Sequence, residues 1–365
     1  MKNKKYYLKL IKIKADLLCY GIRQNKYSKE FYKIQNPYNI QKGGLIGLHF
    51  VLDDTLQILA STTYEFDKKS QFEIIKEKKE FYLKSKKEKI KISPIIMPKW
   101  YNKKTSTGKQ MSKIFAHESN NFLHQQYSGC IYQSTGFGCK FCGTGKNFIY
   151  NTPKEIAETV ITAYKENKNY QVCLGGGTRS TTEKNSEYFI ECIKLIRKEN
   201  KKIPIWIEMT PPTTDITIKN LIKVGATAFG LNLEIWDDKL RKNICPGKSK
   251  ISKKRYFEAW KYIKNTVGKD KVNTALIAGL EPKTSILKGI HKISQQGIRI
   301  TLLPFKPWDT SEFKYKKPKT PKELYSLSMS LAKDMIKYNI PEKQNYGCAS
   351  CTSCTLEEDI KKYLF

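Results

Sequence analysis

Three cysteines stand close together in the segment GCIYQSTGFGCKFCGTG, residues 129–145. They are Cys130, Cys139 and Cys142, and Phe141 separates the last two. A metal site, a disulfide or chance could each explain such a group. Disulfides are rare where the cell keeps thiols reduced, whereas thiolates bind zinc and iron–sulfur clusters well. The clustering therefore favours a metal site.

A second group of cysteines lies in CASCTSC, residues 348–354. Its members are Cys348, Cys351 and Cys354. The C-x2-C-x2-C spacing matches the first three ligands of a ferredoxin-type cluster, and no further cysteine follows it. Three interpretations stay open: an auxiliary iron–sulfur cluster, a zinc site, or thiols without a metal. A fourth cluster ligand could come from Cys245, from Cys19 or from a substrate.

The net charge of +33 over 365 residues suggests a nucleic-acid partner. However, the positive residues are 61 lysines and only 6 arginines. Nucleic-acid sites use arginine for bidentate contacts, so a solvated lysine surface is the preferred interpretation and an RNA substrate stays an alternative. No apolar run has membrane-spanning length, and the basic start of the chain lacks the apolar core of a secretion signal. We expect a cytoplasmic protein.

The elements that must position these residues follow a repeating pattern. Short apolar runs alternate with helix-length amphipathic segments. The predicted strands are residues 128–133, 170–176, 203–209, 227–233, 272–280 and 298–305. Six such repeats predict parallel strands with helical crossovers, a partial (β/α)6 TIM-like barrel. We expect a barrel core over 121–306, a β-rich region over 1–120 that begins with the strand-like stretch YYLKLIKIKADLL, and a cysteine-bearing tail over 307–365.

Polar and glycine residues stand at the ends of the predicted strands. They are Gly175, Gly176, Gly177, Thr178, Glu208, Asn232 and Glu234. Strand ends of such a barrel share one rim, where its chemistry gathers. Cys139 and Cys142 would lie on that rim, in the loop after the first strand, and Cys130 would lie within that strand. Three thiolates would leave one iron of a [4Fe–4S] cluster without a protein ligand, because such a cluster normally has four.

Several motifs together resemble the radical S-adenosylmethionine (radical SAM) superfamily, most closely its biotin-synthase-like branch. They are CKFC in the cysteine segment, LGGGT at 174–178, and GLNLEIWD, RYFEAW and IAGLEP further on. The resemblance covers about residues 125–305. One feature departs from it: the superfamily's usual loop has three residues between the first two cysteines, and this chain has eight.

The resemblance implies a [4Fe–4S] cluster on Cys130, Cys139 and Cys142, with S-adenosylmethionine (SAM) at the open iron. Reductive cleavage of SAM would yield a 5′-deoxyadenosyl radical that abstracts hydrogen from a small molecule or an RNA. A flavodoxin or ferredoxin would deliver the electron. By the same likeness the cofactor contacts would be Phe141, Gly175, Gly176, Gly177, Thr178, Glu208, Asn232, Glu234 and Arg255. Asn232 and Glu234 would hold the ribose, and Arg255 the carboxylate.

Two nearby residues are interpreted as structural. Cys173 lies within the second predicted strand and is expected in the core, and His124 is expected to have no role in the site. A rival function from another class is a metal-binding nucleic-acid protein without radical chemistry. The order of the barrel motifs argues against that rival.

Overall fold

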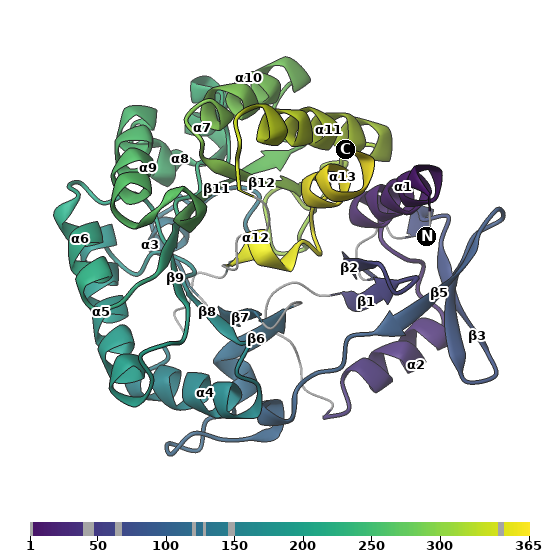
Figure 1. The fold of residues 1–365 in the computed structure, drawn as a ribbon, viewed down its shortest axis with the longest axis horizontal. Helices are drawn as coiled ribbons and strands as arrows, with labels where there is room; N and C mark the ends of the chain where they lie inside the picture. The colour runs from purple at the N-terminus through teal and green to yellow at the C-terminus, as the bar shows by residue number, and fades with distance from the viewer. Residues whose placement is uncertain are drawn as a thin grey trace.

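The computed structural model describes residues 3–38, 47–62, 68–118, 122–126, 129–144, 150–341 and 347–365, without the side chains of residues 348 and 349. A seven-stranded sheet curls through one half of the molecule, and helices cover its outer side (Figure 1). Its strand order is β12-β11-β10-β9-β8-β7-β6. Neighbouring strands from β7 to β12 pair in parallel, and β6 pairs antiparallel with β7. The predicted partial (β/α)6 barrel is confirmed.

Strands β8 to β12 match the last five predicted apolar runs, with shorter bounds, whereas β6 and β7 were not predicted. The strands of this half-barrel are β6 Phe115–Glu118, β7 Phe122–Gln125, β8 Gln171–Leu174, β9 Ile205–Glu208, β10 Ala228–Gly230, β11 Val272–Ala278 and β12 Arg299–Pro304. The helices between them are α3 Ile131–Ser134, α4 Pro153–Glu166, α5 Thr182–Glu199, α6 Ile216–Lys223, α7 Asp238–Ile244, α8 Pro246–Ser249, α9 Lys253–Val267 and α10 Lys283–Ser294. The first predicted strand is wrong, because residues 131–134 form α3.

Helix α4 shows how local chemistry sets these boundaries. Thr152 accepts a hydrogen bond from the backbone of Glu155 at 3.2 Å, and the Glu155 carboxylate accepts one from Thr152 at 2.8 Å. This reciprocal cap satisfies two backbone N–H groups that the first turn leaves without a helical partner. Ile156, Val160 and Ala163 then repeat at helical spacing and are buried against the sheet.

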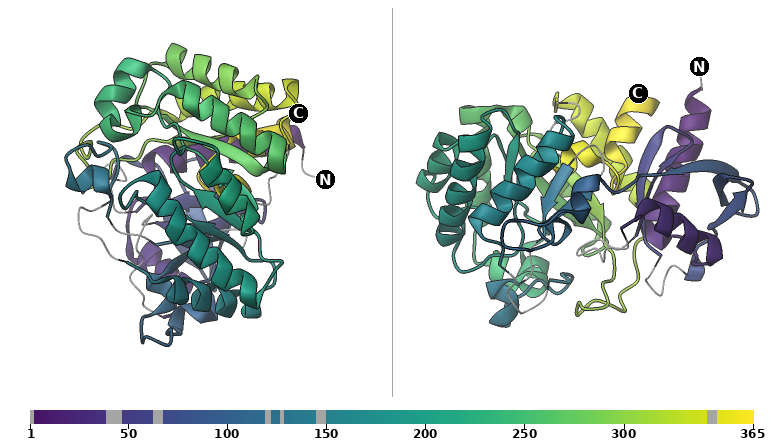
Figure 2. Two further views of the ribbon diagram at one scale, coloured as in Figure 1. Left: turned by 90° about the vertical axis from the view of Figure 1, so that its left-hand side faces the viewer. Right: turned by 90° about the horizontal axis from the view of Figure 1, so that it is seen from below.

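The N-terminal region forms a five-stranded antiparallel sheet, ordered β2-β1-β5-β4-β3, with two helices. Its elements are α1 Lys4–Tyr20, α2 Lys26–Gln35, β1 Leu48–Leu52, β2 Leu56–Ala60, β3 Glu73–Glu77, β4 Glu80–Lys84 and β5 Lys89–Pro94, followed by the short 3₁₀ turns Lys99–Asn102 and Met111–Lys113. Figure 2 shows this region beside the half-barrel. Strand β6 belongs to the barrel sheet, so hydrogen bonds cross residue 120; the domain boundaries stay predictions.

The predicted strand at the start of the chain is also wrong. YYLKLIKIKADLL lies within helix α1, where Asn3 caps the first turn by accepting a hydrogen bond from the backbone of Tyr6 at 3.0 Å. Leu10, Lys14 and Leu18 are buried on one face, four residues apart. Alternating lysines and β-branched residues mimic a strand, but burial at helical spacing decides the structure.

Three C-terminal helices connect the two regions. They are α11 Pro321–Lys337, α12 Cys348–Cys351 and α13 Glu357–Leu364. In Figure 1, α12 lies inside the space between the curled sheet and the N-terminal strands, and α13 lies between α11 and α1. Lys14 of α1 is fully buried and pairs with Asp359 of α13 at 2.6 Å. The tail therefore joins the first helix to the barrel. In the described residues, no helix has the length and hydrophobicity that a bilayer crossing demands.

Candidate functional site

The cysteine loop, residues 129–144, follows β7 at the carboxyl end of the sheet. Cys130 has extended backbone angles and precedes α3, so it lies in this loop and not within a strand. Gly129, with φ of 100°, adopts a conformation that ordinary residues avoid, and this turn separates Cys130 from the strand. The backbone N–H of Cys142 donates to the Cys139 carbonyl at 3.0 Å. All three predicted ligands thus come from one loop.

The glycine turn at 175–177 lies directly against this loop. The Ile131 N–H donates to the Thr178 carbonyl at 2.7 Å. A Cβ added at Gly177 would lie 2.8 Å from the Cβ of Cys130, and one added at Gly175 would lie 2.6 Å from the Cβ of Glu208. Such distances are shorter than any side chain tolerates, so these glycines permit the close approach. The predicted neighbourhood of the two motifs is confirmed.

Cys139 lies among apolar side chains with a positive charge nearby. Together with Phe141 it packs against Ile244, Cys245 and Phe305. A hydrogen bond from Cys245 lowers the pKa of the Cys139 thiol; burial opposes this shift, and the charge of Lys248 adds to it. Burial instead raises the pKa of the Cys142 thiol, although hydrogen bonds from Thr144 oppose the change. Cys139 is thus the thiol best prepared to bind a metal as thiolate.

The two predicted ribose residues each have a charged partner: Lys248 for Glu234 and Glu208 for Asn232. Lys248 Nζ lies 2.6 Å from Glu234 Oε1. Burial alone would lower the pKa of Lys248, but the charges of Glu234 and Cys139 outweigh it and the pKa is raised. The Asn232 amide donates to Glu208 Oε1 and accepts from the Ala275 N–H at 3.1 Å. Sequence reasoning missed Lys248, which nothing distinguishes among 61 lysines.

Glu234 holds an unusual backbone position. Its φ of 69° is in the left-handed region, which few residues other than glycine adopt. The Glu234 N–H donates to the Ala275 carbonyl at 2.9 Å, and its carbonyl accepts from Ile277 at 3.0 Å. Strand β11 therefore holds the strained residue from both sides. Backbone strain kept in this way is typical of functional positions.

Arg255 is engaged at the start of α9. Its Nε donates to the Pro212 carbonyl at 2.7 Å, and its guanidinium pairs with Asp215. These contacts join α9 to the loop after β9. The neighbouring Tyr256, not Arg255, reaches Asn232, because its hydroxyl donates to the Asn232 carbonyl at 3.3 Å. The role predicted for Arg255 stays a prediction.

Two residues interpreted as structural face the inside of the half-barrel. His124 Nε2 lies 3.5 Å from Glu208 Oε2, and the Cys173 thiol lies 3.9 Å from the same oxygen. Burial lowers the pKa of His124, but the hydrogen bond and charge of Glu208 outweigh it and the pKa is raised. Burial raises the pKa of Glu208, but the hydrogen bond and charge of His124, together with Asn232 and Lys248, outweigh it and the pKa is lowered. Cys173 is fully buried, as predicted, but it belongs to this polar group.

The C-terminal cysteine segment, residues 347–354, occupies the inner side of the same sheet. Cys351 packs against Phe122, Cys173 and Trp206. The Gly347 N–H donates to Gln171 Oε1 at 2.9 Å, and Gln171 Nε2 donates to Ser350 at 2.6 Å.

Of the C-terminal cysteines whose side chains are described, Cys351 is buried and Cys354 is partly buried. Burial raises the pKa of Cys354 to about 12, although the charge of Lys306 opposes it. The Cys348 side chain lies outside the described residues. Of the suggested fourth ligands, Cys245 contacts Cys139 in the cysteine loop.

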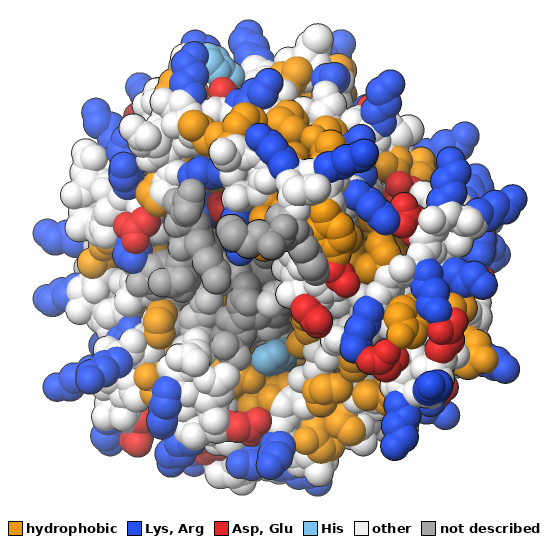
Figure 3. Space-filling view, turned by 45° about the vertical axis from the view of Figure 1, so that its right-hand side comes forward, with side chains coloured by type: hydrophobic (Ala, Val, Ile, Leu, Met, Phe, Trp, Pro, Cys, Tyr) orange, Lys and Arg blue, Asp and Glu red, His pale blue; other side chains and the backbone are white. Residues whose placement is uncertain are grey.

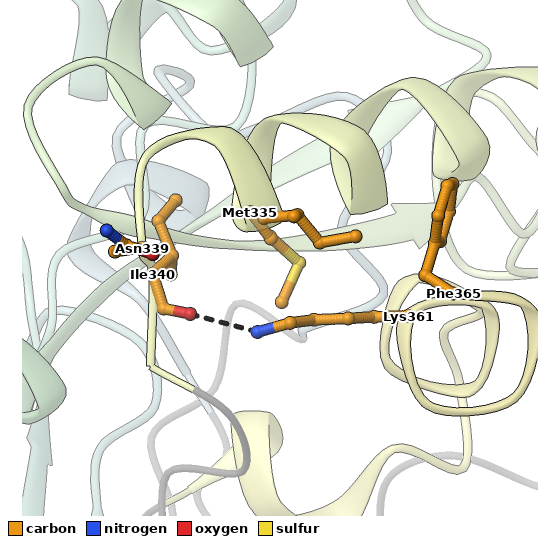
Figure 4. A pocket seen from close by; sticks show the side chains of 6 residues that line it. Met335, Asn339, Ile340, Lys361 and Phe365 are labelled. Atoms are coloured by element: carbon orange, nitrogen blue, oxygen red, sulfur yellow. Dashed lines mark hydrogen bonds between the residues drawn. The ribbon is translucent and has the colours of Figure 1, made fainter.

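A pocket of about 460 Å³ lies elsewhere, between α11 and α13. It is lined by Met335, Ile336, Asn339, Ile340, Lys361 and Phe365, and Lys361 donates to the Ile340 carbonyl at 3.1 Å across it (Figure 4). None of the predicted site residues lines this pocket. On the face shown in Figure 3, Lys and Arg side chains are spread around the outline and do not gather into one patch.

This chain is similar to known proteins in sequence and in fold. Residues 131–303 match the model of the radical SAM superfamily, a range that begins one residue after Cys130. The bacteriochlorophyllide c C-7(1)-hydroxylase of Chlorobaculum limnaeum is 24% identical over 264 residues, which cover 66% of each chain. Two solved structures are similar: coproporphyrinogen III oxidase (HemN) of Escherichia coli and HydG, a maturase of the [FeFe]-hydrogenase.

The extent of these similarities is limited. HemN is 14% identical with a TM-score of 0.43 over 60% of this chain, and HydG is 17% identical with a TM-score of 0.47 over 63%. The chain spans 66% of the length of the hydroxylase and 52% of each structure. The domain match confirms the predicted radical SAM superfamily domain over residues 131–303, whereas the predicted branch is not tested.

Proposed function

We propose that the radical SAM superfamily domain formed by residues 131–303, together with Cys130, holds a [4Fe–4S] cluster and cleaves SAM reductively. When bound, the cluster would supply the electron that releases a 5′-deoxyadenosyl radical, which abstracts hydrogen from the substrate. The observation that carries this proposal is the contact between the cysteine loop and the glycine turn, where Cys130 lies against Gly177.

The donor set fits such a cluster. Cys130, Cys139 and Cys142 come from one loop, each is partly exposed, and the described residues show no disulfide among them. Three thiolates are the ligands expected for an iron–sulfur cluster with one open iron. Lys248, near Cys139, provides positive charge that stabilises thiolates before the metal binds. The chain's own contribution is therefore to hold these three sulfurs on one loop beside the rim, with Cys139 favoured as thiolate.

The cofactor contacts are proposed along the same rim. The backbone of Gly175, Gly176 and Gly177, with Thr178, would receive the amino acid part of SAM. Phe141 would pack beside it. Asn232 and Glu234 would bind the ribose. Arg255 would bind the carboxylate of SAM once it has released its contact with Asp215. Glu208 would contact the same cofactor through the oxygen that Asn232 holds. Lys248 joins this set, since it neutralises Glu234 and orients its carboxylate.

A second cluster at the C-terminal cysteine segment is part of the proposal. Cys351 and Cys354 lie close enough for each charge to affect the other. An auxiliary cluster bound by Cys348, Cys351 and Cys354 would lie on the inner side of the half-barrel, facing the space that substrate enters. Iron analysis would give about eight irons per chain with two [4Fe–4S] clusters and about four with one.

A small molecule is the proposed substrate. The similar hydroxylase is named for a bacteriochlorophyllide, which makes hydrogen abstraction from a small organic molecule a suitable precedent. On the face that Figure 3 shows, the positive side chains are scattered, whereas RNA binding through that face would favour a continuous positive surface. A flavodoxin or ferredoxin is the proposed reductant. A salt series of tRNA binding tests the RNA alternative, because phosphate contacts weaken steeply with salt.

Anaerobic incubation of reconstituted protein with SAM and dithionite tests the function directly. We expect 5′-deoxyadenosine from the wild type and from Cys192→Ala, whose buried cysteine lies on α5 away from the loop. The Cys139→Ala/Cys142→Ala double variant should produce none and lose its brown absorbance. Full iron content and full cofactor cleavage in that double variant would end the assignment.

A further inference from the structure

A group of metal-binding side chains lies apart from both cysteine groups. The ligand atoms of His124, Cys173 and Glu208 all lie within 4.8 Å of one another. They come from three neighbouring parallel strands, β7, β8 and β9. His124 lies opposite Cys173 in the ladder, and Cys173 lies opposite Trp206, two residues before Glu208. Adjacent strands therefore bring the three side chains into one row.

The alternation of the strands turns this row toward the inside of the half-barrel. Leu123, Val172 and Ile207 pack in the large core shared with the helices. Phe122, Cys173 and Trp206 pack on the other face, together with Cys351. Because successive side chains of a strand point to opposite faces, His124 and Glu208 share the inner face with Cys173. A ligand bound there would be inside the half-barrel.

We propose that His124, Cys173 and Glu208 bind one divalent metal ion of the zinc type. Zinc bonds of about 2.0–2.3 Å to nitrogen, oxygen and sulfur place tetrahedral ligand atoms about 3.4–3.6 Å apart. The separations are 3.5 Å between His124 Nε2 and Glu208 Oε2 and 3.9 Å between Cys173 Sγ and the same oxygen, and all three ligand atoms lie within 4.8 Å of one another. The two distances to Glu208 are thus close to the spacing that zinc requires. A mixed nitrogen, sulfur and oxygen set suits zinc, which is of borderline softness.

The surroundings complete such a site. Thiolate and carboxylate together balance a charge of +2. Asn232 donates to the other oxygen of Glu208 and is itself fixed by the Ala275 N–H, so a second layer orients the carboxylate. The rings of Phe122 and Trp206 stack with their centroids 6.1 Å apart, and they make one side of the proposed metal site apolar. The His124 side chain is 36% exposed, which leaves a path for the ion. Three protein ligands leave a fourth position for water or substrate.

This site does not depend on the proposed radical chemistry. It uses none of the six cysteines assigned to iron–sulfur clusters. It also gives Glu208 Oε2 a role separate from the cofactor contact proposed for the oxygen that Asn232 holds.

Zinc retention by the full chain tests the proposal. Anaerobically reconstituted protein is mixed with Zn²⁺, desalted in the presence of a weak chelator, and analysed for zinc and iron. We expect about one zinc per wild-type chain, bound at least tenfold more weakly in His124→Ala, Cys173→Ser and Glu208→Gln, with iron unchanged. Matched controls are His291→Ala on α10 and, on α5, the buried Cys192→Ser and the exposed Glu191→Gln, which should keep the zinc.

X-ray absorption at the zinc edge needs only the wild-type protein, so a folding defect in a variant cannot affect the result. We expect one sulfur at about 2.3 Å and nitrogen or oxygen at about 2.0–2.1 Å. An all-sulfur shell would place the zinc in a cysteine group and overturn the proposal, as would equal zinc in the three variants and the wild type. Lost iron and absent deoxyadenosine would instead contradict the proposed function, so the two failures are distinguishable.

Discussion

The cysteine loop and the C-terminal cysteine segment carry three cysteines each, and Cys139 of the loop and Cys354 of the segment lie in opposite electrostatic surroundings. In the loop, Cys139 is partly exposed, and its pKa is lowered by the hydrogen bond with Cys245 and the charge of Lys248. In the segment, burial raises the pKa of Cys354 to about 12, and Cys351 packs against aromatic rings. The thiolate form is therefore favoured at Cys139 and disfavoured at Cys354.

Cysteine spacing alone therefore does not determine how readily a group of cysteines binds a metal. Metal binding requires thiolate, so Cys139 is the cysteine expected to bind metal most readily, whereas Cys354 must first lose a proton. Four predictions test this contrast, and the one with the largest expected effect comes first.

The largest effect is expected from removing one cysteine of each group. Cys139→Ala should reduce 5′-deoxyadenosine to the level of a protein-free control, because SAM would lose its open iron. Cys351→Ala should keep most of the cleavage of SAM and lose only the iron of the second cluster. Anaerobic product analysis with iron quantitation measures both. Equal loss of cleavage in the two variants would abolish the contrast.

The next effect concerns the anchor of the C-terminal cysteine segment. Lys14→Met should lower the free energy of unfolding by about 3–5 kcal/mol, because Asp359 would keep a buried charge without its partner. Lys14 also donates to the Thr352 carbonyl at 2.8 Å, so the segment itself should loosen. Urea unfolding followed by circular dichroism measures this. The exposed Lys12→Met, on the same helix, should change stability by no more than about 0.5 kcal/mol.

A pH effect should arise beside the same anchor. Burial raises the pKa of Glu357 to about 7, above its usual 4.5. Between these values the unfolded chain has released a proton that the folded protein still holds, so stability falls as pH rises from 4.5 to 7 and then levels off. The loss amounts to about 3 kcal/mol at most. Unfolding at pH 5 and pH 8 should show it in the wild type but not in Glu357→Gln; an equal pH dependence in both would contradict it.

The smallest effect is expected on the alkylation rate of Cys139 in the cysteine loop. In metal-free protein, Lys248→Gln should slow alkylation of Cys139 at pH 7 by a few-fold, because loss of the positive charge raises the thiol pKa. Lys242→Gln, exposed on α7, is the control. Mass spectrometry of labelled peptides measures the rates, and Cys354 should stay unlabelled until the protein unfolds. Labelling of Cys354 as fast as Cys139 would show that the two environments do not differ.

Much of the half-barrel could be predicted from the sequence, because parallel strands buried on both faces are continuous apolar runs. The runs around Cys173, Trp206 and Leu276 each became strands. The glycine turn was found by its position after the second run. Two strands were predicted wrongly. In α1 the lysine alternation imitated a strand, and around Cys130 an apolar run concealed a turn at Gly129.

The residues that sequence reasoning missed depend on contacts between distant parts of the chain. His124 and Cys173 are 49 positions apart and become neighbours only through the parallel register of β7 and β8. Lys248 reaches Glu234 because α7 and α8 bring the chain back over the rim. The position of the C-terminal cysteine segment on Trp206 has no local signal at all. Such pairs need the sheet order and register, which the pattern of one sequence does not specify.

The backbone of Gly347 lies on the Trp206 ring, so closely that an added Cβ would fall 0.9 Å from it. The segment that follows is secured by Lys14 and Asp359, which are 345 positions apart. During protein synthesis the inner wall of the half-barrel therefore stays uncovered until residues 347–359 have left the ribosome. A chain stalled shortly after β12 should leave Trp206 open to a collisional quencher, whereas the finished protein should shield it. The inner wall is thus the last part of the half-barrel to be enclosed as the chain is made.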